Sequence, residues 1–266
     1  MSFPLFRATL KANWVITAIF ALLLCMYLGS IISLYDPASS QTLEDMLKLF
    51  PEALAKALGI SDLPKDLTGF LGNSFYGMLV FLLPLIYIAI MGSRLMAKHV
   101  DNGAMAYFLS TPNTRGKIAL TQGIYFISGI FALFLVLIVA GIGICQATYP
   151  GHLDIPSFLL LNFCAFLLTC AISAISWLFS CMFSDVKYSL AFGAGIPVLF
   201  FMLNMLGSMQ DRLSSIAALS LYKLFDASAI LSGSADILQM CLIFAGITLM
   251  LYAAGIIVFK KKSLPL

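Results

Sequence analysis

The sequence predicts an all-α, polytopic integral membrane protein with six transmembrane helices. Hydrophobic residues make up 61% of the chain and charged residues only 10%, whereas soluble proteins average about half apolar and about a quarter charged residues. A membrane-spanning helix needs about 20 apolar residues. Six runs without Asp, Glu, Lys or Arg have this length: 12–35, 75–93, 118–149, 155–183, 188–209 and 237–259.

These runs are continuously apolar, which favours helices over the alternating strands of a membrane barrel. In lipid, each helix satisfies its own backbone hydrogen bonds. Six spans within 266 residues leave no room for a sizeable soluble domain, so we expect one transmembrane domain over 1–266. The first run is longer than a signal-peptide core of about 7 to 15 residues and is expected to be retained.

The N-terminal segment 1–11 predicts a short helix on the membrane surface. Three large apolar residues recur there at helical spacing, and two basic residues stand four positions apart. These residues are Phe3, Phe6, Leu10, Arg7 and Lys11. A basic amphipathic helix of this kind lies along the lipid headgroups.

The basic residues predict that both termini are cytoplasmic. Cytoplasmic loops carry an excess of Lys and Arg, and three regions on one side of the predicted bundle carry such residues: Arg7, Lys11, Arg94, Lys98, Arg115, Lys117, Lys260, Lys261 and Lys262. The loop after the first span has six acidic residues and three lysines, a net charge of −3, so it belongs outside. We expect a multi-pass protein of the plasma (cytoplasmic) membrane.

The two extracellular segments, 36–74 and 210–236, are expected to contain short helices. In the first segment, apolar positions at helical spacing precede Pro51, which can open a second helix that Gly59 ends. The second segment is too polar to span the membrane. It predicts either a pair of short helices that re-enter from outside or a surface loop.

The spans lack the residues that ion relays and enzymes use. No span carries a charged residue, although functional charges are usually retained in such helices. His99 and His152 lie outside the spans, and the chain has no phosphate-binding G-x-x-x-x-G-K-[ST] sequence. The six cysteines lie within or beside apolar runs without C-x-x-C spacing. We therefore expect no catalytic residue, no metal site and no cofactor in this chain.

The fourth span has one polar face. Thr169, Ser173, Ser176 and Ser180 follow one another at steps of 4, 3 and 4, and Asn162 lies seven residues before Thr169. Small polar residues allow close packing of membrane helices. The same face would also suit a hydrophilic transport path, so both interpretations stay open.

Two prolines interrupt apolar runs at positions that correspond if the chain is a three-plus-three repeat. Pro84 lies in the second span and Pro197 in the fifth. Interrupted helices in corresponding halves are a pointer to transport sites, and an ordinary kink is the alternative. We include both prolines among the residues of a possible transport path.

The loop 94–117 contains the most distinctive residues of the chain. Asp101 and Asn102 can cap a helix, Gly103 tolerates a close backbone approach, and two aromatic residues can anchor in a partner's pocket. Nearby basic residues and a histidine can contact that partner or anionic lipid headgroups. The candidate contact residues of this loop are Arg94, Lys98, His99, Asp101, Asn102, Gly103, Tyr107, Phe108 and Arg115.

This loop resembles that of type-2 ABC exporter permeases, in which an acidic, glycine-containing turn precedes a helix and a Leu-Ser-x-Pro-x-x-Arg stretch. The matching residues are Asp101, Gly103, Leu109, Ser110, Pro112 and Arg115. The resemblance implies a cytoplasmic coupling helix that sits in a cleft of the ATPase. Many members have a glutamate where this chain has His99, so the salt bridge of that glutamate is not expected here.

The resemblance extends over the chain and implies the membrane-spanning subunit of an ATP-driven exporter. The implied partners are two copies of an ABC ATPase, which bind ATP and Mg, and a second permease as homodimer or similar heteropartner. The relatives it suggests export amphipathic peptides, including phenol-soluble-modulin-type toxins and antimicrobial peptides, or hydrophobic drugs. Membrane lipid is expected as a partner and nucleic acid is not. An ion-coupled secondary transporter and a non-transporting sensor or immunity subunit are the alternatives.

Overall fold

The computed structural model describes residues 1–35, 66–76, 79–110, 114–209 and 220–262. Over these ranges the chain is helical. The helices are α1 Phe3–Ser33, α4 Leu67–Ser74, α5 Leu79–Leu95, α6 Ala97–Asp101, α7 Ala104–Ser110, α8 Arg115–Thr148, α9 Ile155–Met182, α10 Val186–Met209, the 3-10 helix η3 Leu221–Leu224, α12 Ala227–Leu231 and α13 Ile237–Lys261.

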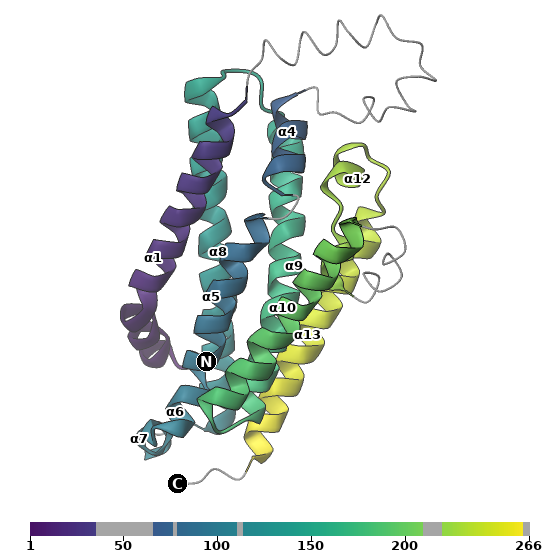
Figure 1. Cartoon of the computed structure of the whole chain (residues 1–266). Coiled ribbons are helices and arrows are strands. Elements are labelled where there is room, and N and C mark those ends of the chain that lie inside the picture. The colour runs from purple at the N-terminus through teal and green to yellow at the C-terminus, as the bar shows by residue number, and fades with distance from the viewer. Residues whose placement is uncertain (36–65, 77–78, 111–113, 210–219, 263–266) are drawn as a thin grey trace, which may run out of the picture.

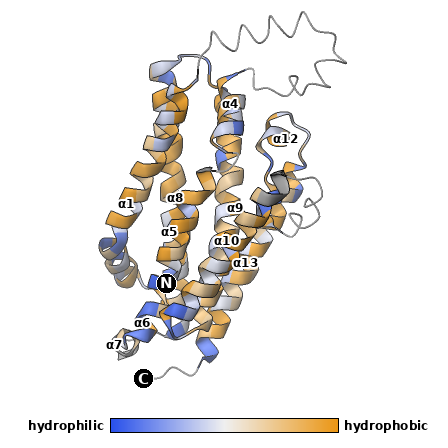
Figure 2. Cartoon of the chain, in the orientation of Figure 1, coloured by the Kyte–Doolittle hydropathy of each residue, from blue (hydrophilic) through white to orange (hydrophobic). Residues whose placement is uncertain are grey.

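Within the described residues, six helical stretches are long and apolar enough to cross a membrane, and the second of them, Val80–Asp101, comprises α5 and α6 together. This confirms the predicted fold class. In Figure 1 the long helices run side by side, with α4 and α12 at one end and α6, α7 and both termini at the other. Figure 2 shows apolar residues along the helix lengths and hydrophilic residues near the ends. Short connections such as 149–154, between α8 and α9, keep consecutive helices adjacent.

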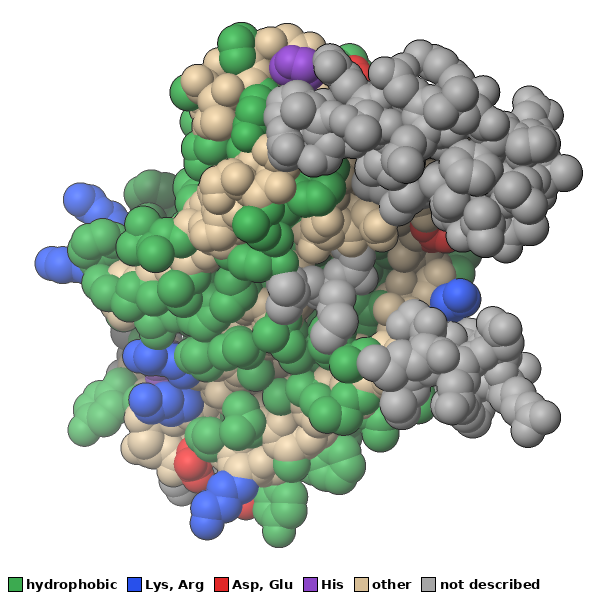
Figure 3. All heavy atoms as spheres, turned by 45° about the horizontal axis from the view of Figure 1, so that its top comes forward, with side chains coloured by type: hydrophobic (Ala, Val, Ile, Leu, Met, Phe, Trp, Pro, Cys, Tyr) green, Lys and Arg blue, Asp and Glu red, His purple; other side chains and the backbone are tan. Residues whose placement is uncertain are grey.

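The end of the bundle that holds both termini is strongly basic, and we call it the basic end. Ten of the chain's 15 lysines and arginines lie there: Arg7, Lys11, Arg94, Lys98, Arg115, Lys117, Lys187, Lys260, Lys261 and Lys262. Asp101 and Asp185 are its acidic residues. In the space-filling view of Figure 3, hydrophobic side chains cover much of the face between the charged groups.

Helix α9 occupies the centre of the bundle. It packs against α13, α10, α5 and α8. In the most apolar 18-residue stretch of α9, 72% of the residues are buried, compared with 22% in the corresponding stretches of α1 and α10. Trp177, Leu168 and Phe158 of α9 are fully buried. The outer helices instead expose large apolar side chains, which fits contact with lipid or with another chain.

The predicted surface segment 1–11 belongs to the same continuous helix as the first span. Hydrogen bonds show that α1 and α8 run parallel over most of their length. Tyr149 donates to the Tyr35 carbonyl and Gln122 donates to Thr9, and the two partners are 114 and 113 residues apart in the sequence. The Ser2 amide donates to Thr121, which is 119 residues away, so the residues before Thr9 do not continue this parallel pairing and cross α8 instead.

The second span begins later than predicted. Phe75 and Tyr76 follow the end of α4, and α5 starts at Leu79 rather than at residue 75. Both aromatic residues are fully buried, which explains why an apolar run in the sequence extends through a break in the helix.

Short helices lie at the end opposite the basic end, as predicted for the extracellular segments. The structure describes α4, η3 and α12 there, whereas the predicted helices around Pro51 lie outside the described residues, as do 210–219. Ser220 donates to the Phe200 carbonyl of α10 over 2.7 Å. This bond ties the segment that carries η3 and α12 to the bundle.

Candidate functional site

The predicted coupling loop contains two short helices that are separated from the second span by a break at Met96. Met96 has φ −127° and ψ −60°, outside helical geometry, and precedes α6. The amide of Ala97, which the break leaves without a helical partner, donates to Ser180 Oγ of α9 over 3.2 Å. A residue predicted to line a transport path thus accepts the first amide of α6.

Gly103 forms the turn between α6 and α7. Its φ of +72° lies in the left-handed region, which glycine adopts at little cost. The side-chain oxygen of Asn102 accepts a hydrogen bond from the Ala104 amide over 3.1 Å at the start of α7, as predicted for a capping residue. Among the described residues, no atom beyond Gly103 and its two chain neighbours lies within 4 Å of the space that a Cβ at Gly103 would take, so this surface is open with respect to the described part of the chain.

Helix α7 combines a buried and an exposed face. Met105 is 1% exposed, whereas Tyr107 is 80% exposed. Phe108 packs edge-on against His99 of α6 with ring centroids 5.0 Å apart. His99 therefore takes part in an aromatic contact between the two short helices.

The charged residues of this region differ in exposure. Arg94 is half-buried near the end of α5, and Lys98 and Asp101 are exposed on α6. The side chains of Leu109 and Ser110 are not described, and Pro112 lies outside the described residues. The Leu-Ser-x-Pro part of the predicted motif is therefore not compared with the structure.

Arg115 contacts this chain itself, although we expected it to face a partner or lipid. Its Nη1 donates to the Lys262 carbonyl over 2.7 Å, and Lys262 Nζ donates to the Cys181 carbonyl over 3.2 Å. Burial lowers the pKa of the Lys262 ammonium. Together these bonds join the start of α8, the end of α9 and the end of α13. Sequence reasoning could not find them, since the partners are distant in the chain and two are backbone carbonyls.

The polar face of α9 is buried inside the chain. Asn162, Thr169, Ser173, Ser176 and Ser180 are all at most 3% exposed. Ser173 shares a hydrogen bond of 3.0 Å with the Tyr252 hydroxyl of α13, and Ser176 donates to the Ile88 carbonyl of α5 over 3.5 Å. Thr169 and Asn162 donate to carbonyls one turn earlier in α9. These contacts favour helix packing over a path lined by this face.

The two candidate prolines are also buried, and they lie within helices rather than ending them. Pro84 is inside α5 and Pro197 inside α10. Pro84 and Thr169 border the same crevice, which has no room for water. The structure therefore brings Pro84 and Thr169 together at a closed contact.

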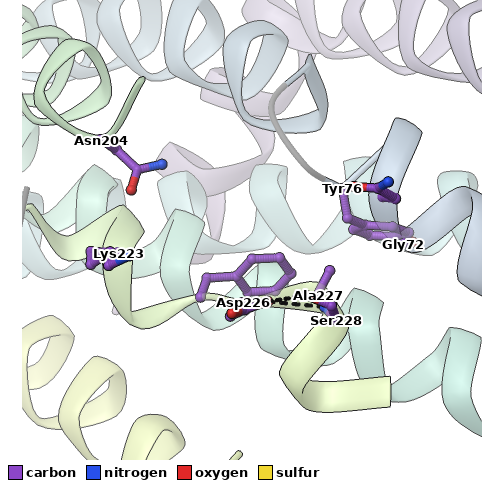
Figure 4. Close-up of a pocket in the computed structure, with 9 residues that line it drawn as sticks. Gly72, Tyr76, Asn204, Lys223, Asp226, Ala227 and Ser228 are labelled. Carbon is purple, nitrogen blue, oxygen red and sulfur yellow. Dashed lines mark hydrogen bonds between the residues drawn. The ribbon is translucent and has the colours of Figure 1, made fainter. Parts of the chain in front are cut away.

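A small polar cavity lies at the opposite end, among α4, α10 and the turn before α12. It has a volume of about 160 Å³, and Figure 4 shows Asn204 on one side and Lys223, Asp226 and Ser228 on another. Asp226 Oδ1 accepts hydrogen bonds from the Ser228 and Ala229 amides over 3.0 and 3.2 Å. Partial burial raises the pKa of Asp226, but these bonds and the charge of Lys223 outweigh it, so the pKa lies below its ordinary value.

The fold and the basic, partly exposed helical turn define the class of protein: a multi-pass membrane subunit with a protruding element at one end. A family model described as an ABC-2 family transporter protein matches residues 7–264. The chain therefore belongs to the ABC-2 transporter family and is the membrane subunit of an ABC transporter, in which the ATPase is a separate chain. No curated protein and no solved structure matched it.

Proposed function

We propose that this chain is the permease of an ATP-driven exporter and that α6 and α7 couple it to the ATPase. Family membership together with the protruding turn at the basic end carries this proposal. The partner ATPase would bind ATP and Mg. We place the basic end in the cytoplasm, where membrane proteins concentrate Lys and Arg, in the plasma membrane.

The exposed side of the turn has the properties of a docking surface. Tyr107 is 80% exposed, and exposed aromatic residues are frequent anchors in protein interfaces. The open space beside Gly103 allows a partner's backbone to approach. Lys98, also exposed, can contact acidic groups on the rim of such an interface.

The buried side of the turn supplies a route by which ATPase movement reaches the spans. Met96 and Met105 are buried, and the Ala97 amide is held by Ser180 of α9. Because α9 packs against α5, α8, α10 and α13, a displacement of α6 acts on the central helix. ATP binding would then shift the population between inward-open and outward-open states.

We propose that the transport path forms between two permease copies, in a homodimer or with a similar heteropartner, together with two ATPases. The apolar surface of α10 supports a second membrane partner, since Leu199 and Met202 are 54% and 58% exposed. Amphipathic peptides of toxin or antimicrobial type, or hydrophobic drugs, are the cargo that such an apolar interface would suit.

The experiment is affinity purification of the tagged protein from its native membrane in mild detergent, followed by an ATPase assay. We expect a P-loop ATPase to co-purify with the wild type and to be lost with Tyr107→Ala combined with Gly103→Trp. Tyr188→Ala is the matched control, because Tyr188 is also an exposed tyrosine at the basic end but lies on α10. This control should retain the ATPase.

Equal retention by both variants would contradict coupling through α6 and α7. An intact protein that yields no ATPase even after crosslinking would favour the ion-coupled transporter. Cargo is tested by adding amphipathic peptides to the purified complex in vesicles. ATP-dependent uptake into inside-out vesicles would support peptide export, and an ATPase partner without uptake of any peptide or drug would favour the sensor or immunity subunit.

A further inference from the structure

A narrow groove runs between α1 and α8 in the half of the bundle near the basic end. Its volume is about 240 Å³ and its lining is mainly apolar. Small residues create it, because Ala18 and Ala21 of α1 lie opposite Gly129 and Ala132 of α8. Trp14 and Val136 form exposed borders and are 57% and 44% exposed. The groove is therefore open to lipid.

Hydroxyl groups lie beside this groove at the level of Thr17. Thr17 Oγ1 and the Tyr87 hydroxyl are 3.2 Å apart in a hydrogen bond. Tyr125 also lines the groove, but it is only 1% exposed and its buried hydroxyl lies beside Thr17. Thr17 lines the groove and is half-buried, so its hydroxyl can meet an acceptor that enters the groove.

The groove has basic residues at one end and no opposing carboxylate. Arg7, Lys11, Trp14 and Ala18 follow at steps of 4, 3 and 4, so they lie on one stripe of α1. Arg7 and Lys11 are exposed, as is Lys117 near the start of α8. Neither α1 nor α8 contains an acidic residue along its length.

The order of these groups along α1 matches the order of groups in a phospholipid. With a rise of about 1.5 Å per residue, Thr17 lies about 9 Å and Ala21 about 15 Å beyond Lys11. The second distance is half of a hydrocarbon core of about 30 Å. Along α1, the charged, hydroxyl and apolar groups thus follow the same order as the phosphate, ester oxygens and acyl chain of one leaflet.

We propose that the groove between α1 and α8 binds an anionic phospholipid from the leaflet at the basic end. Arg7 and Lys11 contact its headgroup, with Lys117 nearby on α8. The hydroxyl of Thr17 faces its ester oxygens, and one acyl chain lies along Ala18, Ala21 and Ala132. Basic pockets between membrane helices recognise anionic headgroups in this way. The site belongs to the permease alone and does not depend on the proposed ATPase coupling.

The test uses the purified, delipidated chain in neutral detergent. Thermal melting is followed during titration with phosphatidylglycerol or with phosphatidylcholine of the same acyl chains, and native mass spectrometry counts bound lipids. We expect phosphatidylglycerol to raise Tm at lower concentration. Arg7→Gln with Lys11→Gln should raise the phosphatidylglycerol concentration at half effect about tenfold or more and leave the phosphatidylcholine response unchanged.

Matched variants separate a site from general attraction to lipid. Lys187→Gln with Lys261→Gln removes two exposed charges at the same end, on α10 and α13 rather than on the helices that form the groove, and it should leave the titration unchanged. Ala132→Phe fills the groove and should abolish the retained lipid, whereas Val139→Phe, at a position 66% exposed outside the groove, should not.

Three results would overturn the proposal. Equal effects of the two charge pairs would mean that lipid is attracted only diffusely. An equal response of the wild type to both lipids would exclude headgroup recognition. A disulfide between two copies of an Ala18→Cys variant in native membranes would show that a second copy of this chain covers the groove.

Discussion

Gly92 and Ser176 lie where α5 crosses α9, and their contact shows how closely residues are packed in this bundle. A Cβ at Gly92 would overlap Ser176 Oγ and lie 3.0 Å from Ser176 Cβ. Gly193 of α10 also lies close to Ser176. A Cβ added at Gly193 would lie 3.2 Å from Ser176 Oγ. One serine therefore sits among three helices, and small side chains set the spacing.

We predict that Gly92→Ala destabilises the chain by about 1 to 3 kcal/mol, because an extra methyl group in a filled core forces side chains and backbone apart. Thermal melting in detergent measures the change. Gly195→Ala is the control, since within the described parts of the chain no atom outside its own helix backbone lies within 4 Å of the added Cβ, and its Tm should stay equal or rise. Similar losses for both variants would contradict the predicted overlap.

Asp226 stabilises α12 most strongly when it is ionised. Its pKa lies below the ordinary value of 3.8 in the folded chain. The stability that the ionised Asp226 carboxylate contributes is therefore fully present above pH 3.8. It is lost as the pH falls through the lower pKa of the folded state.

We predict that Asp226→Ala costs about 0.5 to 2 kcal/mol at neutral pH, because two amides at the start of α12 lose their acceptor. Below about pH 4 the difference from the wild type should shrink as the native carboxylate becomes protonated. Melting curves at pH 7 and near pH 3 check this. A difference that is the same at both pH values would rule out the ionised cap.

At the scale of elements, the break between α5 and α6 is the feature that links the candidate site to the bundle. The sequence predicted a helix within 94–117 from Asp101, Asn102 and Gly103, and the capping by Asn102 agrees. The sequence did not predict the hydrogen bond from the Ala97 amide to Ser180. The residues around Ser180 do not show whether its hydroxyl accepts a hydrogen bond from a distant amide or only packs against another helix.

We predict that Ser180→Ala loosens α6, because the fully buried Ala97 loses the acceptor for its amide. The cost of about 1 to 3 kcal/mol should speed hydrogen exchange over 96–110 about fivefold or more. Ser176→Ala is the control one turn earlier, where the hydrogen bond to Ile88 is long at 3.5 Å. Unchanged exchange in Ser180→Ala would show that α6 is held by apolar packing alone.

For the whole molecule, the apolar runs of the sequence can be compared with the helices. The runs 155–183 and 237–259 correspond to α9, Ile155–Met182, and to α13, Ile237–Lys261. Depth within the bundle could not be predicted in the same way. The sequence of the polar face of α9 is compatible with both a water-filled path and a contact between helices. The hydrogen bonds with Tyr252, Ile88 and Ala97 favour the contact between helices.

We predict that the basic end faces the cytoplasm, because ten basic residues would otherwise have to be translocated. In intact cells, a membrane-impermeant thiol reagent should label Ser234→Cys, at an exposed position of the opposite end, and should label Tyr107→Cys only after permeabilisation. The wild type, with its six native cysteines, gives the background. Reversed labelling would invert the topology.

The dense packing of α9 also bears on how such a transporter is built. Its hydroxyl face bonds within the same chain, and the crevice at Pro84 and Thr169 is closed. A copy that enters the membrane before its partners arrive would therefore conduct no protons or sodium ions along this helix. The cell could then hold unassembled copies without discharging its membrane voltage.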